Sequence, residues 1–215
     1  MSSATLTRTA VGPVVLRTRP AFDLDDEQFF EFCRLNDELR IERSAEGDIE
    51  VMPPTGGTTG SRNMHLSVAL GVWALDDDTG VGFDSSTGFR LPNGATRSPD
   101  ASWVEGSRLA NLTTHEMDRF LPLCPDFVVK LLSPSDRLTT IQSKMEEYMA
   151  NGARLGWLLD PEARRAYVYR PGAEVEETEA DELSGEGVLP GFTLRLPPIW
   201  ETRTRFAKRT DKADE

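Results

Sequence analysis

One lysine inside an apolar run is the first residue in this sequence whose type and position could support chemistry. The run is FVVKLL, residues 127–132, and the lysine is Lys130. A charged side chain in a buried strand is costly unless it has a partner or a function. The alternative is an edge strand whose second face meets water. Acids and bases elsewhere in the chain are therefore candidates for a site around Lys130.

Other common chemistries have little support. The two histidines, His65 and His115, are too few and too far apart for a histidine-based metal site. Ser133 and Ser135 have no histidine nearby in sequence, so a serine triad is not indicated. The glycines of residues 56–60 lack the lysine–serine pair of a P-loop, and we interpret them as a flexible loop over a site.

The elements that must position Lys130 follow the order strand, turn, helix, turn, strand. The first strand stops at SPSD, residues 133–136, because proline cannot donate to a β-ladder and Ser and Asp prefer turns and helix starts. A helix with apolar residues at helical spacing follows and stops near Gly152. Residues 155–160, LGWLLD, form a second buried strand.

The remaining pattern predicts an α/β or α+β fold with a mixed sheet. Asp23 or Asp25 can cap a helix that precedes a β-hairpin made of residues 39–43 and 49–52. The other expected elements are a helix from Ser61, strands at 81–91 and 98–104, a helix at 114–120, a strand at 165–170 paired with 155–159, and a final strand within 188–196. We expect an N-terminal arm at 1–20, a single domain at 21–200, and a charged, disordered tail at 201–215.

Composition points to a soluble cytoplasmic protein. Of 215 residues, 38% are hydrophobic and 28% charged, no window approaches the length of a membrane span, and no secretion signal is present. Cys33 and Cys124 are too far apart in sequence to indicate a disulfide framework or a zinc site. The net charge of −12 argues against a protein that coats nucleic acid non-specifically. Much of the acid lies at 23–31 and 174–186, which we interpret as solvated surface.

Several separated segments carry a resemblance. RSPDASWV, CPDFVVKLLSPSD and KMEEYMANGARLGWLLDP resemble a large bacterial family called Uma-two, described as putative restriction endonucleases. The likeness continues in ELRIERSAEGDIEVMPPTGG, FDSSTGFRLPNGA and SGEGVLPGFTL, so it covers roughly residues 22 to 200. The family is similar to the PD-(D/E)xK nuclease superfamily. The resemblance implies a restriction-endonuclease-like core with flanking helices, DNA as substrate, a homodimer, and magnesium (or manganese) at one sheet edge.

The resemblance also assigns roles to residues. Phosphodiester hydrolysis needs a hard cation that polarises the phosphoryl oxygen and activates water, and magnesium prefers carboxylate ligands. Family members place an acid at Asp100, and Glu42 is commonly part of the same pattern, so both are candidate metal ligands. Lys144, on the helix, is the candidate catalytic base or charge stabiliser. The candidate catalytic residues are thus Asp100, Lys144 and Lys130.

This chain departs from the family pattern at Lys130, where the family usually has a glutamate. The change removes one metal ligand and puts a cation about where the metal binds, and like charges at ~4 Å repel by several kcal/mol even with partial screening. Lys130 could bridge Asp100 and Glu42 instead. We expect weakened magnesium binding and weak or absent hydrolysis, unless Asp126 or Asp136 replaces the missing ligand.

Each candidate also has an ordinary structural interpretation. Asp100 after a proline could be a turn residue, and Glu42 in an alternating strand could be exposed. Lys144 could lie along the surface and pair with Glu147.

Three functions remain open from the sequence. The first is a metal-dependent DNA endonuclease, which needs a compensating acid. The second is a catalytically inactive nuclease-fold protein that binds nucleic acid or protein, which predicts a Lys130–Asp100 ion pair. The third is a dimeric scaffold, which an apolar patch on the N-terminal hairpin would support.

Overall fold

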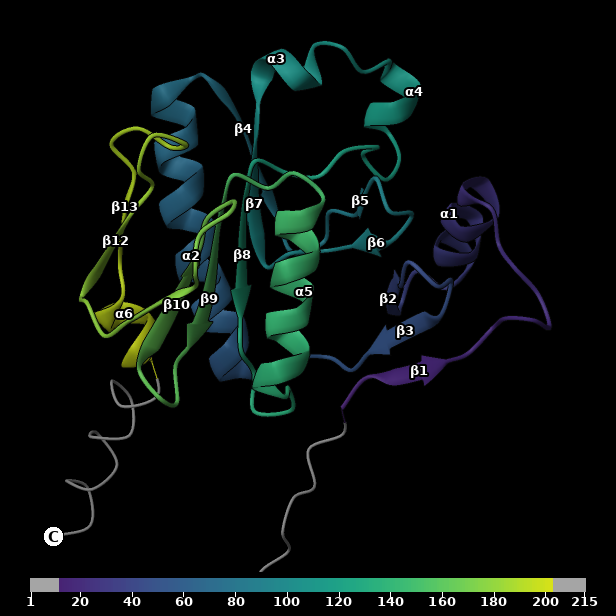
Figure 1. Ribbon diagram of the computed structural model, residues 1–215, viewed down its shortest axis with the longest axis horizontal. Coiled ribbons are helices and arrows are strands. Elements are labelled where there is room, and N and C mark those ends of the chain that lie inside the picture. Colours follow the sequence, from purple (N-terminus) through teal and green to yellow (C-terminus); the bar gives the residue numbers. More distant parts are fainter. Residues whose placement is uncertain (1–11, 203–215) are drawn as a thin grey trace, which may run out of the picture.

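Two large sheets and a two-stranded one make up a mixed α/β fold in residues 12–202, the part of the chain that this computed structural model describes (Figure 1). The strands are β1 (Val14–Leu16), β2 (Arg40–Arg43), β3 (Ile49–Met52), β4 (Gly80–Asp84), β5 (Phe89–Arg90), β6 (Thr96–Arg97), β7 (Ala101–Glu105), β8 (Phe127–Leu131), β9 (Leu155–Asp160), β10 (Arg165–Tyr169), β11 (Glu176–Thr178), β12 (Glu182–Ser184) and β13 (Thr193–Arg195). The helices are α1 (Asp26–Leu35), α2 (Gly57–Asp77), α3 (Gly106–Leu109), α4 (Thr114–Met117), α5 (Leu138–Ala150) and α6 (Pro197–Trp200).

The central sheet has the strand order β11-β10-β9-β8-β7-β4. Its β8 and β9 run parallel and are joined by α5, whereas the other neighbours are antiparallel. The predicted succession of strand, helix and strand is therefore confirmed, and so is the pairing of β9 with β10. Every residue of β8 and β9 is buried, because helices and loops cover both faces of the sheet.

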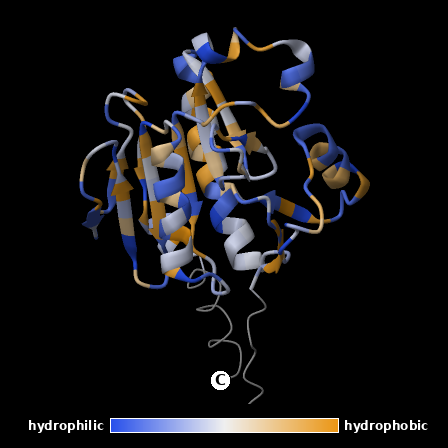
Figure 2. Ribbon diagram, turned by 45° about the vertical axis from the view of Figure 1, so that its right-hand side comes forward, coloured by the Kyte–Doolittle hydropathy of each residue, from blue (hydrophilic) through white to orange (hydrophobic). Residues whose placement is uncertain are grey.

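Side chains alternate along β8 between two hydrophobic layers. Phe127, Val129 and Leu131 pack in the layer that contains α2, while Val128 packs in the layer that contains α5. The two helices thus cover opposite faces of the central sheet, and Figure 2 shows the apolar residues concentrated in the strands between them. By the same alternation Lys130 faces α5.

The N-terminal sheet has the order β1-β3-β2-β6-β5 and contains the predicted hairpin, β2 and β3. Asp25 caps α1, whose Phe29 packs with Ile41 and Ile49 of this sheet. The described part of the predicted N-terminal arm includes β1, which pairs with β3. Residues 1–11 of the arm, and the predicted tail from residue 203 onward, lie outside the described residues.

Some elements differ from expectation. The glycines predicted as a flexible loop lie partly in the first turn of α2, which begins at Gly57, because Thr59 is already buried there. The expected helix at 114–120 spans only Thr114–Met117. The acidic side chains at 174–186 are exposed, as expected, but the stretch also contains β11, which pairs with β10, and β12, which pairs with β13. No helix in residues 12–202 is long and apolar enough to cross a membrane.

Candidate functional site

Lys130 has the partner that its position in a buried strand requires. Its Nζ lies 3.3 Å from Oδ2 of Asp100 and donates to the carbonyl oxygen of Ser98, also at 3.3 Å. Because β8 lies between β7 and β9, the edge-strand alternative for Lys130 is wrong. The ion pair is the one predicted for the second function.

Asp100 joins β7 to β8 and is buried. Its amide donates to Val129 at 2.9 Å, and its Oδ2 accepts from the amide of Leu131 at 2.7 Å. Its Oδ1 lies 3.6 Å from the guanidinium of Arg40. Both carboxylate oxygens therefore face donors of the protein. The alternative interpretation of Asp100 as an ordinary turn residue does not account for these contacts.

Glu42 and Glu50 lie directly opposite each other in the hairpin of β2 and β3. Like charges in such a cross-strand pair repel unless a cation lies between them. Lys144 of α5 supplies one, with its Nζ 2.7 Å from each carboxylate. Glu42 is only 2% exposed, so the interpretation of Glu42 as an exposed residue is wrong.

Arg97 of β6 is the second cation between these strands. Its Nη1 lies 2.7 Å from Glu50 and 3.3 Å from Glu42, while its Nε lies 2.6 Å from Glu147 of α5. Lys144 thus pairs with the hairpin, and Glu147 pairs with Arg97. The predicted alternative of a Lys144–Glu147 pair is not what the structure shows.

These charges keep each other ionised. Burial raises the pKa of Glu42, but the charges of Lys144, Lys130 and Arg97 outweigh it and bring that pKa to about 2. Burial acts against the charge of Lys144 as well, yet the neighbouring Glu42 raises its pKa above the ordinary value. An ammonium has no lone pair for a proton, so at neutral pH the arrangement suits Lys144 to charge stabilisation and not to general-base work.

The group has a balanced charge. We call it the charge cluster: Glu42, Glu50, Asp100, Glu147, Arg40, Arg97, Lys130 and Lys144. Four carboxylates and four cations give a formal charge of zero. The cluster joins the hairpin and β6 of the N-terminal sheet to β8 of the central sheet and to α5.

Comparisons with known proteins identify the family and a similar fold. Residues 26–197 match the family Uma2, whose description is "Putative restriction endonuclease". The chain belongs to the Uma2 family. It is similar to a crystal structure of "a putative nuclease belonging to DUF820" from Anabaena variabilis, with a TM-score of 0.66 and 18% identity, over 77% of this chain and 92% of that one. No curated protein matches it. The resemblance seen in the sequence is thus confirmed as to family.

The Uma2 resemblance implies a magnesium ion, and the residues present do not fit one. Within residues 12–202 there is no group of three acidic, histidine or cysteine side chains arranged to hold a metal. Asp100 and Glu42 direct their oxygens at Lys130, Lys144, Arg97 and main-chain amides. Magnesium needs carboxylate oxygens without such competitors.

Neither candidate replacement ligand lies in the cluster of this Uma2 protein. Asp126 is at the opposite end of β8 from Lys130, where it pairs with Arg108 at 2.9 Å and accepts from the amide of Glu105. Asp136 accepts from the amide of Ser133 at 2.8 Å and holds the turn after β8. Each acid has a structural partner of its own.

Sequence reasoning missed Glu50, Arg97 and Arg40, and it named Glu147 only as an alternative partner of Lys144. One signal was available, because the predicted hairpin with its turn near residue 47 places Glu50 opposite Glu42. Two facing glutamates require a cation. Nothing local indicates that Arg97 reaches Glu147, 50 residues away.

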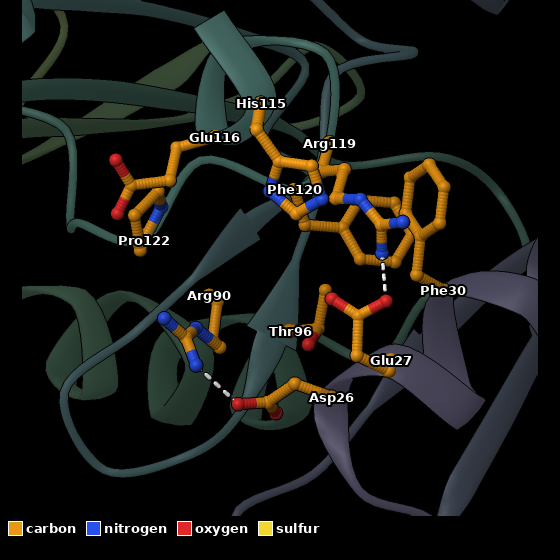
Figure 3. Close-up of a pocket in the computed structure, with 10 residues that line it drawn as sticks. All are labelled: Asp26, Glu27, Phe30, Arg90, Thr96, His115, Glu116, Arg119, Phe120 and Pro122. Atoms are coloured by element: carbon orange, nitrogen blue, oxygen red, sulfur yellow. Dashed lines mark hydrogen bonds and ion pairs between the residues drawn. The ribbon is translucent and has the colours of Figure 1, made fainter. Parts of the chain in front are cut away.

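A hollow of about 100 Å³ lies away from the charge cluster, between α1, β5 and the segment around α4 (Figure 3). Arg90 pairs there with Asp26, and Arg119 pairs with Glu27 while its guanidinium lies 4.8 Å above the ring of Phe30. The basic and acidic side chains pair with each other across the hollow. We interpret it as the attachment of α1 to the rest of the fold.

Proposed function

We propose that this Uma2 protein acts on DNA through the charge cluster, on a restriction-endonuclease-like core, and that its magnesium-dependent hydrolysis is weak or absent. The observation that carries the proposal is the buried ion pair between Lys130 and Asp100, at 3.3 Å. DNA as substrate is supported by the family, whose description names restriction endonucleases.

Charge explains why the ion pair matters. Hydrolysis of a phosphodiester in this class of enzyme relies on a cation that polarises the phosphoryl oxygen. The charge cluster is already neutral, so a divalent cation entering it would leave an excess of two positive charges. A glutamate at position 130 in place of Lys130 would give the cluster a charge of −2, which one divalent cation neutralises. Lys130 thus supplies part of the charge that the ion supplies elsewhere.

Residue roles follow from this arrangement. In a chain with an acid at position 130, Asp100 and Glu42 are the proposed ligands of magnesium or manganese. Lys144 is the proposed charge stabiliser, since its ammonium lies between Glu42 and Glu50. In the present chain these acids bind lysine and arginine instead.

Nicking of supercoiled plasmid tests the proposal. With magnesium or manganese, we expect Lys130→Glu to nick at least ten times faster than the wild type. The control Lys130→Glu/Asp100→Asn lacks the proposed ligand and is expected to be inactive. Fast nicking by the wild type that Asp100→Asn abolishes would show that Lys130 is compatible with catalysis.

A second function, a nuclease-fold protein that binds nucleic acid without cutting it, is favoured by the fully paired cluster. We expect the wild type to bind duplex DNA in the presence of EDTA, as measured by fluorescence anisotropy. Since the net charge is −12, binding has to rely on local basic surface and to weaken steeply with salt. Absence of binding at low salt would remove this function.

The third function, a scaffold that dimerises through the hairpin, requires an exposed apolar patch there. Ile41 and Ile49 of the hairpin are buried against α1, whereas Leu39 is 43% exposed.

A further inference from the structure

The outer face of α2 carries a stripe of exposed apolar side chains. Met64, Val68, Val72 and Leu75 are 64%, 53%, 65% and 86% exposed. Steps of four, four and three residues put them on one side of the helix. The opposite side, which includes Leu66, already packs on the central sheet. The helix thus has two apolar faces, and residues 12–202, the described part of the chain, cover only one of them.

A shallow groove of about 780 Å³ runs beside this stripe. Val68, Val72 and Leu75 form one wall, and the turn that carries Phe192 forms the other. The groove extends the exposed apolar surface beyond the helix. Contiguous surface of this kind marks an interaction site more often than chance exposure does.

Two polar side chains mark the ends of the stripe. His65 lies near its start, and its Nδ1 interacts with the carbonyl oxygen of Ser61, which leaves Nε2 for another partner. Asp76 lies at its end and has no hydrogen bond or ion pair within residues 12–202. Eleven residues of helix separate the two by about 16 Å, so they cannot meet within one chain.

Gly71 lies midway between these ends. A Cβ built there meets no atom within 4 Å, so no contact among the described residues requires glycine. Glycine is a poor helix former, and its usual benefit is the close approach of another backbone. This position in α2 is therefore suited to a second helix.

We propose that the α2 stripe docks against the α2 stripe of a second copy, antiparallel, around a two-fold axis near Gly71. This register brings His65 of one copy to Asp76 of the other at both ends of the contact. Val68 and Val72 then pack across the axis. The surface is self-complementary, because each copy offers the imidazole of His65 at one end and the carboxylate of Asp76 at the other, as a two-fold interface requires.

The expected dimer is weak. A 21-residue helix is about 31 Å long, so contact along it buries on the order of 600 Å² in total. The groove walls add to this area, but the sum stays below the ~1,600 Å² of a standard stable interface. We expect dissociation in the micromolar range.

The proposed interface affects how DNA is reached. Since α2 and α5 cover opposite faces of the central sheet, pairing through α2 turns the two charge clusters outward. The two clusters then contact separate stretches of DNA.

Sedimentation equilibrium from about 1 to 300 µM tests the interface. We expect the wild type to form a reversible dimer and Leu75→Glu to weaken it at least ten-fold. The control variants are Met117→Glu and Val15→Glu, which place the same charge at exposed apolar positions on α4 and β1. A monomer at every concentration, or a dimer that Leu75→Glu leaves unchanged, would overturn the proposal, and weakening by Val15→Glu alone would place the contact at β1.

A charge exchange tests the antiparallel register. His65→Asp and Asp76→His should each weaken the dimer, whereas the double variant should recover most of the affinity. A double variant weaker than either single one would show that these positions do not meet. Circular dichroism confirms that each variant is folded.

Gly71→Ala distinguishes an effect on the interface from an effect on the stability of the helix. Alanine should raise the unfolding temperature of the monomer and weaken the dimer at the same time. If alanine strengthens both, Gly71 does not lie at a close contact between helices.

Discussion

Lys130 determines the charge of the cluster and shows how one residue sets the properties of a site. It lies on the α5 face of β8, where strand alternation directs it at Asp100. Asp100 also accepts a hydrogen bond from the amide of Leu131 and lies near Arg40, so its carboxylate has three partners, counting Lys130. A buried ion pair contributes little net stability against an apolar replacement, but removal of one partner is costly.

The Lys130–Asp100 pair therefore predicts a measurable coupling. We expect Lys130→Met to lower the free energy of unfolding by about 2 kcal/mol, because Asp100 keeps Arg40 and one amide as partners. Adding Asp100→Asn to this variant should cost less than Asp100→Asn costs in the wild type. Urea unfolding of the four proteins gives the coupling energy. Strictly additive costs would mean that the pair does not form.

The low pKa of Glu42 makes the free energy of unfolding depend on pH in the acid range. Its pKa of about 2 in the folded protein lies below the ordinary 4.5, so it contributes stability above pH 4.5 that is lost as pH falls toward 2. A shift of this size corresponds to roughly 3 kcal/mol. We expect Glu42→Gln to be less stable than the wild type at pH 7, and the difference between the two to shrink toward pH 2. If the difference in the free energy of unfolding between the two proteins stays constant across this pH range, Glu42 is not ionised in the cluster.

Helix α5 is the element that brings Lys144 and Glu147 to the cluster, and it packs closely on β9. Gly156 makes this possible, because a Cβ there would lie 2.7 Å from Met145 Cε and 3.0 Å from Met149 Cε. The neighbouring atoms are the ends of flexible side chains, so the helix can adjust at some cost.

Gly156→Ala should therefore destabilise the fold by about 1–3 kcal/mol, the range for overpacked cores. Met145→Ala makes room for the new methyl group, so the double variant should lose less stability than the sum of the two single variants. Thermal unfolding measures all three. If the double variant loses as much stability as the two single variants together, Met145 does not obstruct the new methyl group.

The elements could be predicted from the sequence where periodicity and breakers agree. The apolar run at 127–132 and the helical spacing that ends near Gly152 gave β8, α5 and β9, and the hairpin followed from alternation around Gly47. The start of α2 was missed, because three glycines favour a loop until tertiary burial of Thr59 is known. In the cluster, Asp100, Glu42 and Lys144 were found through family likeness. Arg97 and Glu147 were not, since only tertiary packing joins residues that distant in sequence.

At the scale of the whole molecule, the charge cluster connects the N-terminal sheet to the central sheet and α5. Arg97 has the largest share of these connections, with ion pairs to Glu42, Glu50 and Glu147. Its loss would leave Glu42 and Glu50 with Lys144 as their ion-pair partner, and Glu147 with a hydrogen bond from the side-chain amide of Asn93.

Arg97→Met should consequently be the most destabilising single change in the cluster, by about 3–5 kcal/mol. Arg97→Lys keeps the charge but not the planar arrangement of donors. It should therefore lower the free energy of unfolding, but by less than Arg97→Met does. Denaturant unfolding, followed by tryptophan fluorescence, reports the loss, because Trp103, Trp157 and Trp200 are buried in the folded protein. A small effect of Arg97→Met would mean that apolar packing alone holds the two sheets together.

The account depends most directly on whether Lys130 takes over the charge of a metal ion. Isothermal titration of magnesium and manganese into the wild type, Lys130→Gln and Lys130→Glu tests this. We predict that Lys130→Glu binds one divalent ion at least ten-fold more tightly than the wild type, with Lys130→Gln between them, since it removes the cation without adding a ligand. Binding by the wild type as tight as that of Lys130→Glu, with all three proteins folded, would contradict the account.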